Sequence, residues 1–167
     1  MTTRREVLQG LIVSIGGATA LTACGGVANV LSTRPGSAAR FYTSEEYVLV
    51  TRISDLIIPR TETPGAVDAN VPGYMDGLMT DWANNETKNA HRTALRKIKV
   101  ELDQRASGNF LDASDSEAEQ SLVSFDAAAF AEDGDASGYK RMKAYVSQSY
   151  FATEDGATEE LKWVAFP

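Results

Sequence analysis

Hydrophobic residues recur at helical spacing in five segments of the chain. The first follows Thr43, which forms a capping-box pattern with Glu46 and so marks the start of a helix. Pro59 predicts where this helix ends, because the residue before a proline is disfavoured in helical geometry. The apolar residues of the segment share one helical face, and that face is expected to be buried: Leu49, Ile53, Leu56 and Ile57.

Two more helices are predicted between residues 72 and 108. Pro72 suits the first turn of a helix, where its missing amide hydrogen costs no hydrogen bond. A longer helix follows Thr87, and Gly108 is a suitable residue to end it. The expected buried faces are Met75, Leu78, Met79 and Trp82 in the first of these helices, and His91, Ala94, Leu95, Ile98 and Leu102 in the second.

A second capping box, formed by Ser114 and Glu117, predicts a fourth helix, and the acidic stretch 132–138 separates it from a fifth. The sequence shows no internal repeat and no run of alternating strands. The predicted fold class is therefore all-α: a single bundle of about five helices, with long ordered loops and a short extended C-terminal tail. The inward-facing residues expected in the last two helices are Ala118, Leu122, Phe125 and Ala129, then Tyr139, Met142, Val146 and Ser149.

The N-terminal region has the layout of an export signal. Arg4 and Arg5 precede a mildly apolar run, residues 8–23, which is interrupted by glycines. A membrane-spanning helix needs ~20 strongly apolar residues, so this run does not predict one. The paired arginines resemble a bacterial twin-arginine signal. Val7 stands where that motif usually has phenylalanine, and Gln9 stands where it often has lysine. A general secretory signal is the alternative.

Residues 21–25 resemble a bacterial lipobox, in which the cysteine thiol receives a lipid. A lipid on Cys24 would hold the mature protein on a membrane surface without crossing it. The alternative is an incidental cysteine near an ordinary cleavage site at residues 18–20. The predicted organisation is a signal peptide over residues 1–23, a flexible tether over 24–40 and a helical domain over 41–167.

Composition narrows the classes of partner. The chain has 16 lysines and arginines against 23 aspartates and glutamates, which gives a net charge of -7. Nucleic acid is excluded as the expected partner, because binding a phosphate backbone requires a clustered basic surface. The chain has one cysteine, so it cannot form an internal disulfide.

Few features of the sequence predict catalysis. It lacks the common nucleophile, zinc-protease, phosphate-loop, dinucleotide and haem-attachment motifs. His91 is the only histidine, and its apolar helical face favours a buried, hydrogen-bonded role over a catalytic one. The acidic residues 132–135 lack the spaced ligands of a calcium loop, and the apolar face 75–82 is more typical of a core than of a cofactor pocket. We therefore assign no catalytic, cofactor-binding or metal-binding residue.

Two extended segments carry a family likeness. The first comprises residues 54–66, with Pro64 and Gly65, and runs on to residues 71–76; the second comprises residues 149–161. Both resemble the gluconate 2-dehydrogenase subunit 3 family. The likeness continues between them through residues 108–110 and the helix that follows, so it covers nearly all of the mature chain.

The resemblance implies an accessory subunit rather than an enzyme. Such a subunit joins a large FAD-dependent dehydrogenase of the glucose-methanol-choline type, often beside a membrane-bound multihaem cytochrome c. FAD and haem c then belong to the partners, which oxidise a sugar, sugar acid or alcohol. The expected location is the periplasm, on the membrane through a lipid on Cys24, after transport by the twin-arginine translocase together with the folded flavoprotein.

The C-terminal residues are the expected contact with the large subunit. Trp163, Val164 and Phe166 have few local partners at the chain end, so we expect them to pack on that subunit or, alternatively, to dock onto the bundle. Two other functions compete with the accessory role. One is a free-standing periplasmic lipoprotein that binds a ligand or an envelope component, and the other is an independent small enzyme.

Overall fold

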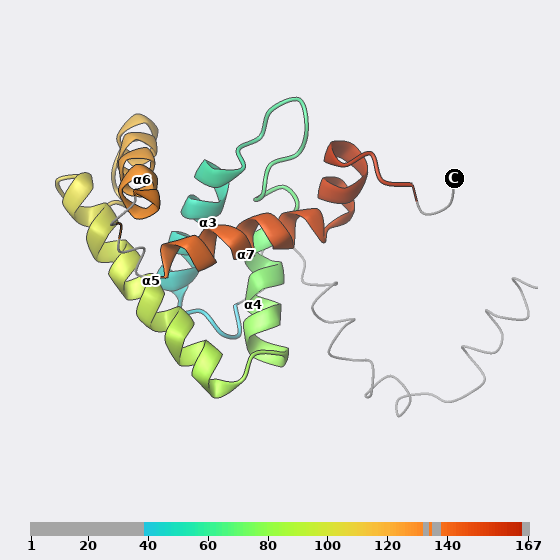
Figure 1. Ribbon diagram of the computed structural model, residues 1–167, viewed down its shortest axis with the longest axis horizontal. Coiled ribbons are helices and arrows are strands. Elements are labelled where there is room, and N and C mark those ends of the chain that lie inside the picture. Colours follow the sequence, from blue (N-terminus) through green and yellow to red (C-terminus); the bar gives the residue numbers. More distant parts are fainter. Residues whose placement is uncertain (1–38, 132–133, 135–137, 165–167) are drawn as a thin grey trace, which may run out of the picture.

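Helices and loops make up the described part of the chain, which comprises residues 39–131, 134 and 138–164 of a computed structural model (Figure 1). The all-α fold class and the expectation of about five helices are confirmed. Arg4, Arg5, Cys24, most of the tether and Phe166 lie outside the described residues. The elements are the α-helices α3 (Ser44–Ile57), α4 (Val71–Asp81), α5 (Asn85–Arg105), α6 (Asp115–Phe130) and α7 (Tyr139–Phe151), and the π-helix η1 (Gly156–Glu160).

Side-chain caps explain where three of the helices begin. Both predicted capping boxes are present, at Thr43 before α3 and at Ser114 before α6. In each, the hydroxyl accepts a backbone hydrogen bond while a glutamate three residues later accepts one in return. The start of α5 lies earlier than Thr87 suggested, because the Asn84 side chain caps the helix by accepting a hydrogen bond from Thr87 N at 2.8 Å.

Two helix ends show the effect of local backbone geometry. Ile58 leaves the helical region at φ -132°, as expected for the residue before Pro59, and α3 ends at Ile57. The left-handed residue after α5 is Ser107, with φ 53°, and not the predicted Gly108. Gly108 N donates to Asp103 O, and Ser107 N donates to Gln104 O, which is the hydrogen-bond pattern of a Schellman motif.

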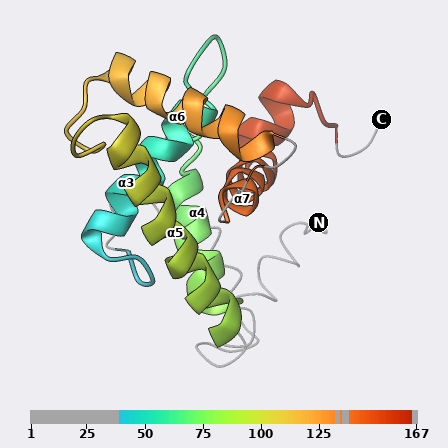
Figure 2. The same ribbon diagram turned by 60° about the vertical axis from the view of Figure 1, so that its left-hand side comes forward.

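The core lies where α7 packs across α4 and α5, with α3 and α6 covering its other sides (Figures 1 and 2). All eight inward-facing residues predicted for α6 and α7 are buried, as are His91, Leu95, Ile98 and Leu102 of α5. In α3 the predicted face is buried at Leu49 and Ile53 and half-buried at its end. Within the described ranges, no helix combines the length and apolarity needed to span a bilayer.

Trp82 is the exception to the predicted apolar faces. Met75 and Met79 are buried as expected, whereas 64% of Trp82 is exposed. The helix ends at Asp81, and Trp82 is its C-cap residue, at the point where the chain leaves α4. The chain then turns into α5 at Asn85. The prediction that Trp82 is buried is therefore wrong.

Candidate partner-binding surface

The two segments that carry the sequence likeness lie side by side. Loop 58–70 joins α3 to α4, and residues 149–161 form the end of α7 and η1 (Figure 1). The Tyr150 hydroxyl donates a hydrogen bond to Pro64 O at 2.7 Å across 86 residues of sequence. The Thr63 hydroxyl donates to the carboxylate of Glu160. The loop and the C-terminal turn therefore form one structural unit.

Loop 58–70 is closed by its own backbone. Ala66 N donates to Ile58 O at 2.8 Å, which brings the two ends of the Pro64 turn together. A side chain at Gly65 would place its Cβ 2.6 Å from Arg60 N, so only glycine fits this closed form. Asp68 accepts a hydrogen bond from Gly65 N at 2.9 Å and pairs with Arg60, whose hydrogen bond holds the pKa of Asp68 below its usual value.

The C-terminal turn is fastened to the last turn of α7. A Cβ at Gly156 would lie 2.2 Å from Tyr150 O, so η1 packs directly on the helix backbone there. The Thr153 hydroxyl donates to Tyr150 O at 2.6 Å and accepts from Gly156 N at 3.2 Å. Farther on, Trp163 N donates to Ala157 O at 3.0 Å. The backbone is thus held by hydrogen bonds as far as Trp163.

This ordered turn presents a set of exposed apolar side chains that we call the C-terminal apolar surface: Phe151, Leu161, Trp163 and Val164. Trp163 is 61% exposed and Val164 is 67% exposed, so neither docks onto the bundle. Large exposed apolar groups on a fixed backbone are typical of interaction sites. Of the three predicted partner contacts, the structure places Trp163 and Val164 on this surface, and Phe166 lies outside the described residues.

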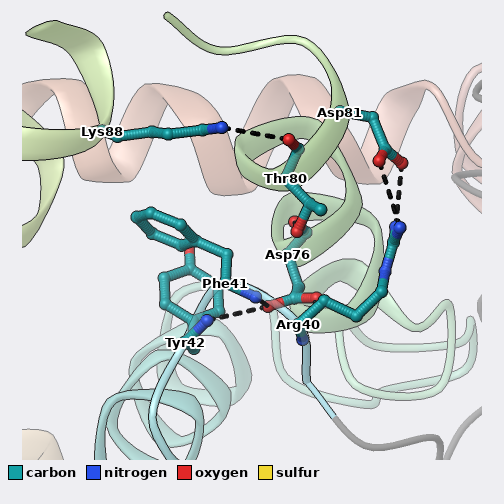
Figure 3. A network of polar contacts seen from close by, with 7 residues as sticks. All are labelled: Arg40, Phe41, Tyr42, Asp76, Thr80, Asp81 and Lys88. Atoms are coloured by element: carbon teal, nitrogen blue, oxygen red, sulfur yellow. Dashed lines mark hydrogen bonds and ion pairs between the residues drawn. The ribbon is translucent and has the colours of Figure 1, made fainter. Parts of the chain in front are cut away.

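A buried carboxylate in α4 holds the first residues of the domain. Only 2% of Asp76 is exposed, and its two oxygens accept hydrogen bonds from the backbone N–H groups of Arg40, Phe41 and Tyr42 at 2.8, 2.9 and 3.0 Å (Figure 3). Beside it, the Arg40 guanidinium makes two hydrogen bonds to Asp81. Burying a carboxylate is tolerated only with such partners. Asp76 thereby fixes residues 40–42 against α4.

Asp76 is not among the residues that the sequence singled out. The signal that it offered is a lone carboxylate on a predicted buried helix between Met75 and Gly77. A charge in that position predicts a buried hydrogen-bond partner, because an unpaired charge in a core is costly. The sequence did not indicate the partner, which is a run of backbone amides more than 30 residues earlier in the chain.

Comparison with known families identifies the chain. The family described as gluconate 2-dehydrogenase subunit 3 has a model that matches residues 44–167, which is more than half of the sequence. The chain belongs to this family. No curated protein and no solved structure matches it. The matched region of this subunit 3 chain begins at the first residue of α3 and contains loop 58–70 and the C-terminal turn, so the family likeness read from those segments is confirmed.

The single histidine of the subunit 3 chain is buried and hydrogen-bonded, as predicted. His91 Nε2 lies 2.8 Å from the Tyr42 hydroxyl, and its ring contacts Phe41 and Tyr145. Burial lowers the pKa of His91 to about 4, an effect that Arg92 strengthens and Glu46 opposes. Burial also raises the pKa of Tyr42. Both groups are therefore uncharged at neutral pH.

The described part of the subunit 3 chain offers no cluster of three or more histidine, cysteine, aspartate and glutamate side chains that could hold a metal ion. The apolar face of α4 belongs mainly to the core. Met75 and Met79 are buried, whereas the half-buried Leu78 and the exposed Trp82, which follows the helix, line with Met79 a hollow of about 200 Å³. The core interpretation of this face therefore holds for Met75 and Met79, but not for Trp82.

Proposed function

We propose that this chain is the noncatalytic small subunit of a periplasmic FAD-dependent dehydrogenase complex of the glucose-methanol-choline type. It aids the maturation, twin-arginine export and stability of the catalytic flavoprotein subunit. The observation that carries the proposal is the family match over residues 44–167, because the family is a subunit of a dehydrogenase complex. FAD belongs to the flavoprotein, and haem c belongs to a cytochrome subunit in complexes that contain one.

The C-terminal apolar surface supports a permanent partner. Trp163 and Val164 stand exposed on a turn that is itself hydrogen-bonded, so binding them loses little backbone freedom. Exposed aromatic residues on a rigid support are typical of the central contacts of protein interfaces. In the proposed complex, the flavoprotein covers this surface.

The N-terminal sequence supports the export role. Arg4 and Arg5 have the twin-arginine layout, and that route carries folded proteins. FAD has to be inserted before the flavoprotein leaves the cytoplasm, so the holoenzyme needs a route for folded cargo. A small subunit with such a signal provides that route to a partner bound to its helical domain. A lipid on Cys24 then keeps the exported complex on the membrane surface.

Co-purification tests the proposal directly. The native chain is captured with an antibody from detergent-solubilised membranes, and the absorption spectrum of the eluate is recorded. We expect flavin bands from the catalytic subunit, with haem bands added where a cytochrome is present. A protein that repeatedly elutes without flavin contradicts the proposal and favours the free-standing lipoprotein.

Two side chains of the C-terminal apolar surface provide a sharper test. The double variant W163A/V164A removes exposed groups and is expected to fold normally, while recovery of the flavoprotein falls about tenfold. The matched control is V48A/V123A, which truncates two exposed valines on α3 and α6. Equal recovery with both double variants rules out a role of the C-terminal apolar surface in binding.

Export is tested at the signal itself. Replacing Arg4 and Arg5 with lysines keeps the charge but removes the guanidinium pair, and we expect the flavoprotein to accumulate in the cytoplasm. Correct export of the flavoprotein with this variant counts heavily against the escort role. The intact mass of the mature chain shows whether it begins at a lipidated Cys24.

A further inference from the structure

A furrow lies between α4, α5 and α7, away from the C-terminal apolar surface. In Figure 1, α4 and α5 diverge from the turn that joins them, and α7 crosses above that turn. One hollow of about 710 Å³ is lined by α5 and α7, and a second of about 200 Å³ by α4 and the start of α5. Thr87 and Tyr145 line both hollows, so the two adjoin. We call them together the α5–α7 furrow.

One end of the α5–α7 furrow is apolar. Leu78, Met79 and Trp82 line it, and Trp82 is the most exposed of the three. Trp82 supplies the accessible apolar surface at this end, and tryptophan is enriched among the strong contacts of protein interfaces. This end is therefore suited to receive an apolar side chain of a partner.

The other end of the α5–α7 furrow is cationic, although the chain as a whole carries a net charge of -7. Lys97, Lys140 and Arg141 line it and are exposed. Among the residues that the structure describes, none of these three forms an ion pair with a carboxylate. The first turn of α7 contains no acidic residue, and the helix dipole adds partial positive charge at this N-terminus.

We propose that the α5–α7 furrow is a second docking site for the catalytic flavoprotein subunit. It takes a protruding segment of that subunit which places an apolar side chain against Trp82 and carboxylates against Lys97 and Arg141. The inference rests on the proposed function, which supplies the partner. Charge complementarity carries it, because exposed cations in a concave site attract an acidic segment and suppress partners of the wrong charge.

Other occupants fit the α5–α7 furrow less well. The chain's own residues 1–38 contain three arginines and one glutamate, so their charge has the same sign as the cationic end. A second copy of the chain carries the same negative net charge, which opposes association. A bilayer is flat, whereas the furrow is a concavity between helices.

The test uses the purified mature chain in detergent and the purified flavoprotein subunit. Affinity is measured at about 50 mM and about 300 mM salt, because added salt screens exposed charges. The charge reversal K97E/R141E is expected to weaken binding about tenfold at low salt and less at high salt. The variant W82A is expected to weaken binding about tenfold at both salt concentrations. Unfolding midpoints confirm that each variant is folded.

Arg96 provides the matched control for the charge reversal. It precedes Lys97 on α5 and is exposed, but it lines a different hollow, near Glu45 and Lys99. The variant R96E is expected to change the affinity less than about twofold, because surface charges outside an interface contribute little. Wild-type affinity of K97E/R141E overturns the inference. An equal loss in R96E and the single reversal K97E, which change the net charge by the same amount, also overturns it, since that loss would reflect net charge alone.

Further outcomes distinguish a failure of this inference from a failure of the proposed function. If only W163A/V164A weakens binding, the inference that the α5–α7 furrow is a docking site is wrong, and the proposed accessory role is unaffected. If K97E/R141E binds the flavoprotein normally but loses binding to vesicles of anionic lipid, the furrow is a membrane contact and the inference fails. The inference also fails if ultracentrifugation shows that the wild-type chain is a dimer and that the K97E/R141E variant is a monomer. If the wild-type chain binds no flavoprotein, both proposals fail.

Discussion

Asp76 is the residue on which the start of the domain depends. Its carboxylate accepts three backbone hydrogen bonds from consecutive residues, and no neutral side chain of that size offers two acceptor oxygens. An asparagine would direct its NH₂ group at one of these N–H donors. The lost bond and the opposed donors both disfavour the folded state, because a buried donor without an acceptor keeps its full desolvation cost.

We expect D76N to lower the free energy of unfolding by about 1–3 kcal/mol, measured by urea titration. The control is D81N, which removes a more exposed carboxylate from the same region, where Asp81 pairs with Arg40. D81N should lower the free energy of unfolding by less, because water replaces the partner of an exposed ion pair. If both variants lose the same free energy of unfolding, the backbone hydrogen bonds of Asp76 stabilise the protein no more than the exposed ion pair of Asp81 does.

The buried His91 gives stability a defined dependence on pH. Its pKa is about 4 in the folded protein, against about 6.5 when unfolded, so the unfolded chain binds the extra proton between these values. The contribution of the neutral His91 to the free energy of unfolding is complete above pH ~6.5 and is lost as the pH falls toward 4. We expect this single group to remove about 2 kcal/mol of unfolding free energy between pH ~7 and ~4.5.

The variant H91Q isolates this effect from the titration of carboxylates. Glutamine retains a hydrogen-bonding group for Tyr42 but carries no titratable proton in this range. Denaturant unfolding of both proteins at several pH values gives the difference in stability between them. That difference should shift in favour of H91Q as the pH falls. A constant difference from pH ~7 to ~4.5 would show that His91 takes up its proton without unfolding.

At the scale of the helices, starts were easier to predict than ends. The two capping boxes involve side chains three residues apart, so the signal lies entirely in the local sequence. The end of α5 depends on which residue adopts the left-handed conformation. Gly108 looked suitable, yet the backbone hydrogen bonds to Asp103 and Gln104 place Ser107 in that position. Glycine preference alone could not locate this end to a single residue.

This geometry predicts a stabilising substitution. Ser107 has φ 53°, a conformation that costs roughly 1 kcal/mol for a residue with a Cβ and little for glycine. We expect S107G to raise the free energy of unfolding by about 0.5–1 kcal/mol, after the greater freedom of glycine in the unfolded chain is allowed for. The control is G108A, which places its Cβ 4.0 Å from the nearest backbone oxygen. A destabilised S107G protein would contradict the assignment of the Schellman motif.

At the scale of the whole molecule, the helical bundle was predictable and its long-range polar contacts were not. The apolar residues of α5, α6 and α7 follow a 3.6-residue period, which determines the buried face without knowledge of what covers it. Trp82 obeyed the same period and was nevertheless exposed, because helix α4 had already ended. A periodic pattern indicates a face only as far as the helix extends.

The candidate surfaces depend on contacts between distant parts of the sequence. Trp163 and Val164 could be singled out from their position, since they are large and apolar beyond the last predicted helix. The hydrogen bond from Tyr150 to Pro64 gave no local signal, because any buried carbonyl oxygen can accept from a tyrosine. The α5–α7 furrow was equally hidden, since its cations come from two helices that are separated by α6.

The contact between loop 58–70 and the C-terminal turn leads to a prediction about local opening. Y150F removes the hydroxyl that binds Pro64 O but keeps the ring in place. Global stability should fall by only about 1 kcal/mol, the usual net value of one hydrogen bond. The loop itself loses its main tie to α7, so trypsin cleavage after the exposed Arg60 should accelerate about fivefold. Mass spectrometry of timed digests measures that cleavage.

The control for this prediction is Y145F on the same helix. Tyr145 lies earlier on α7 and contacts the ring of His91 in α5. Its hydroxyl can be removed without changing the bond to Pro64, so cleavage after Arg60 should keep its wild-type rate. If Y150F leaves this rate unchanged, Thr63 and Glu160 suffice to hold the loop. If both variants accelerate it equally, the loop opens only when the whole bundle unfolds, and the surface formed by the two family segments has no independent stability.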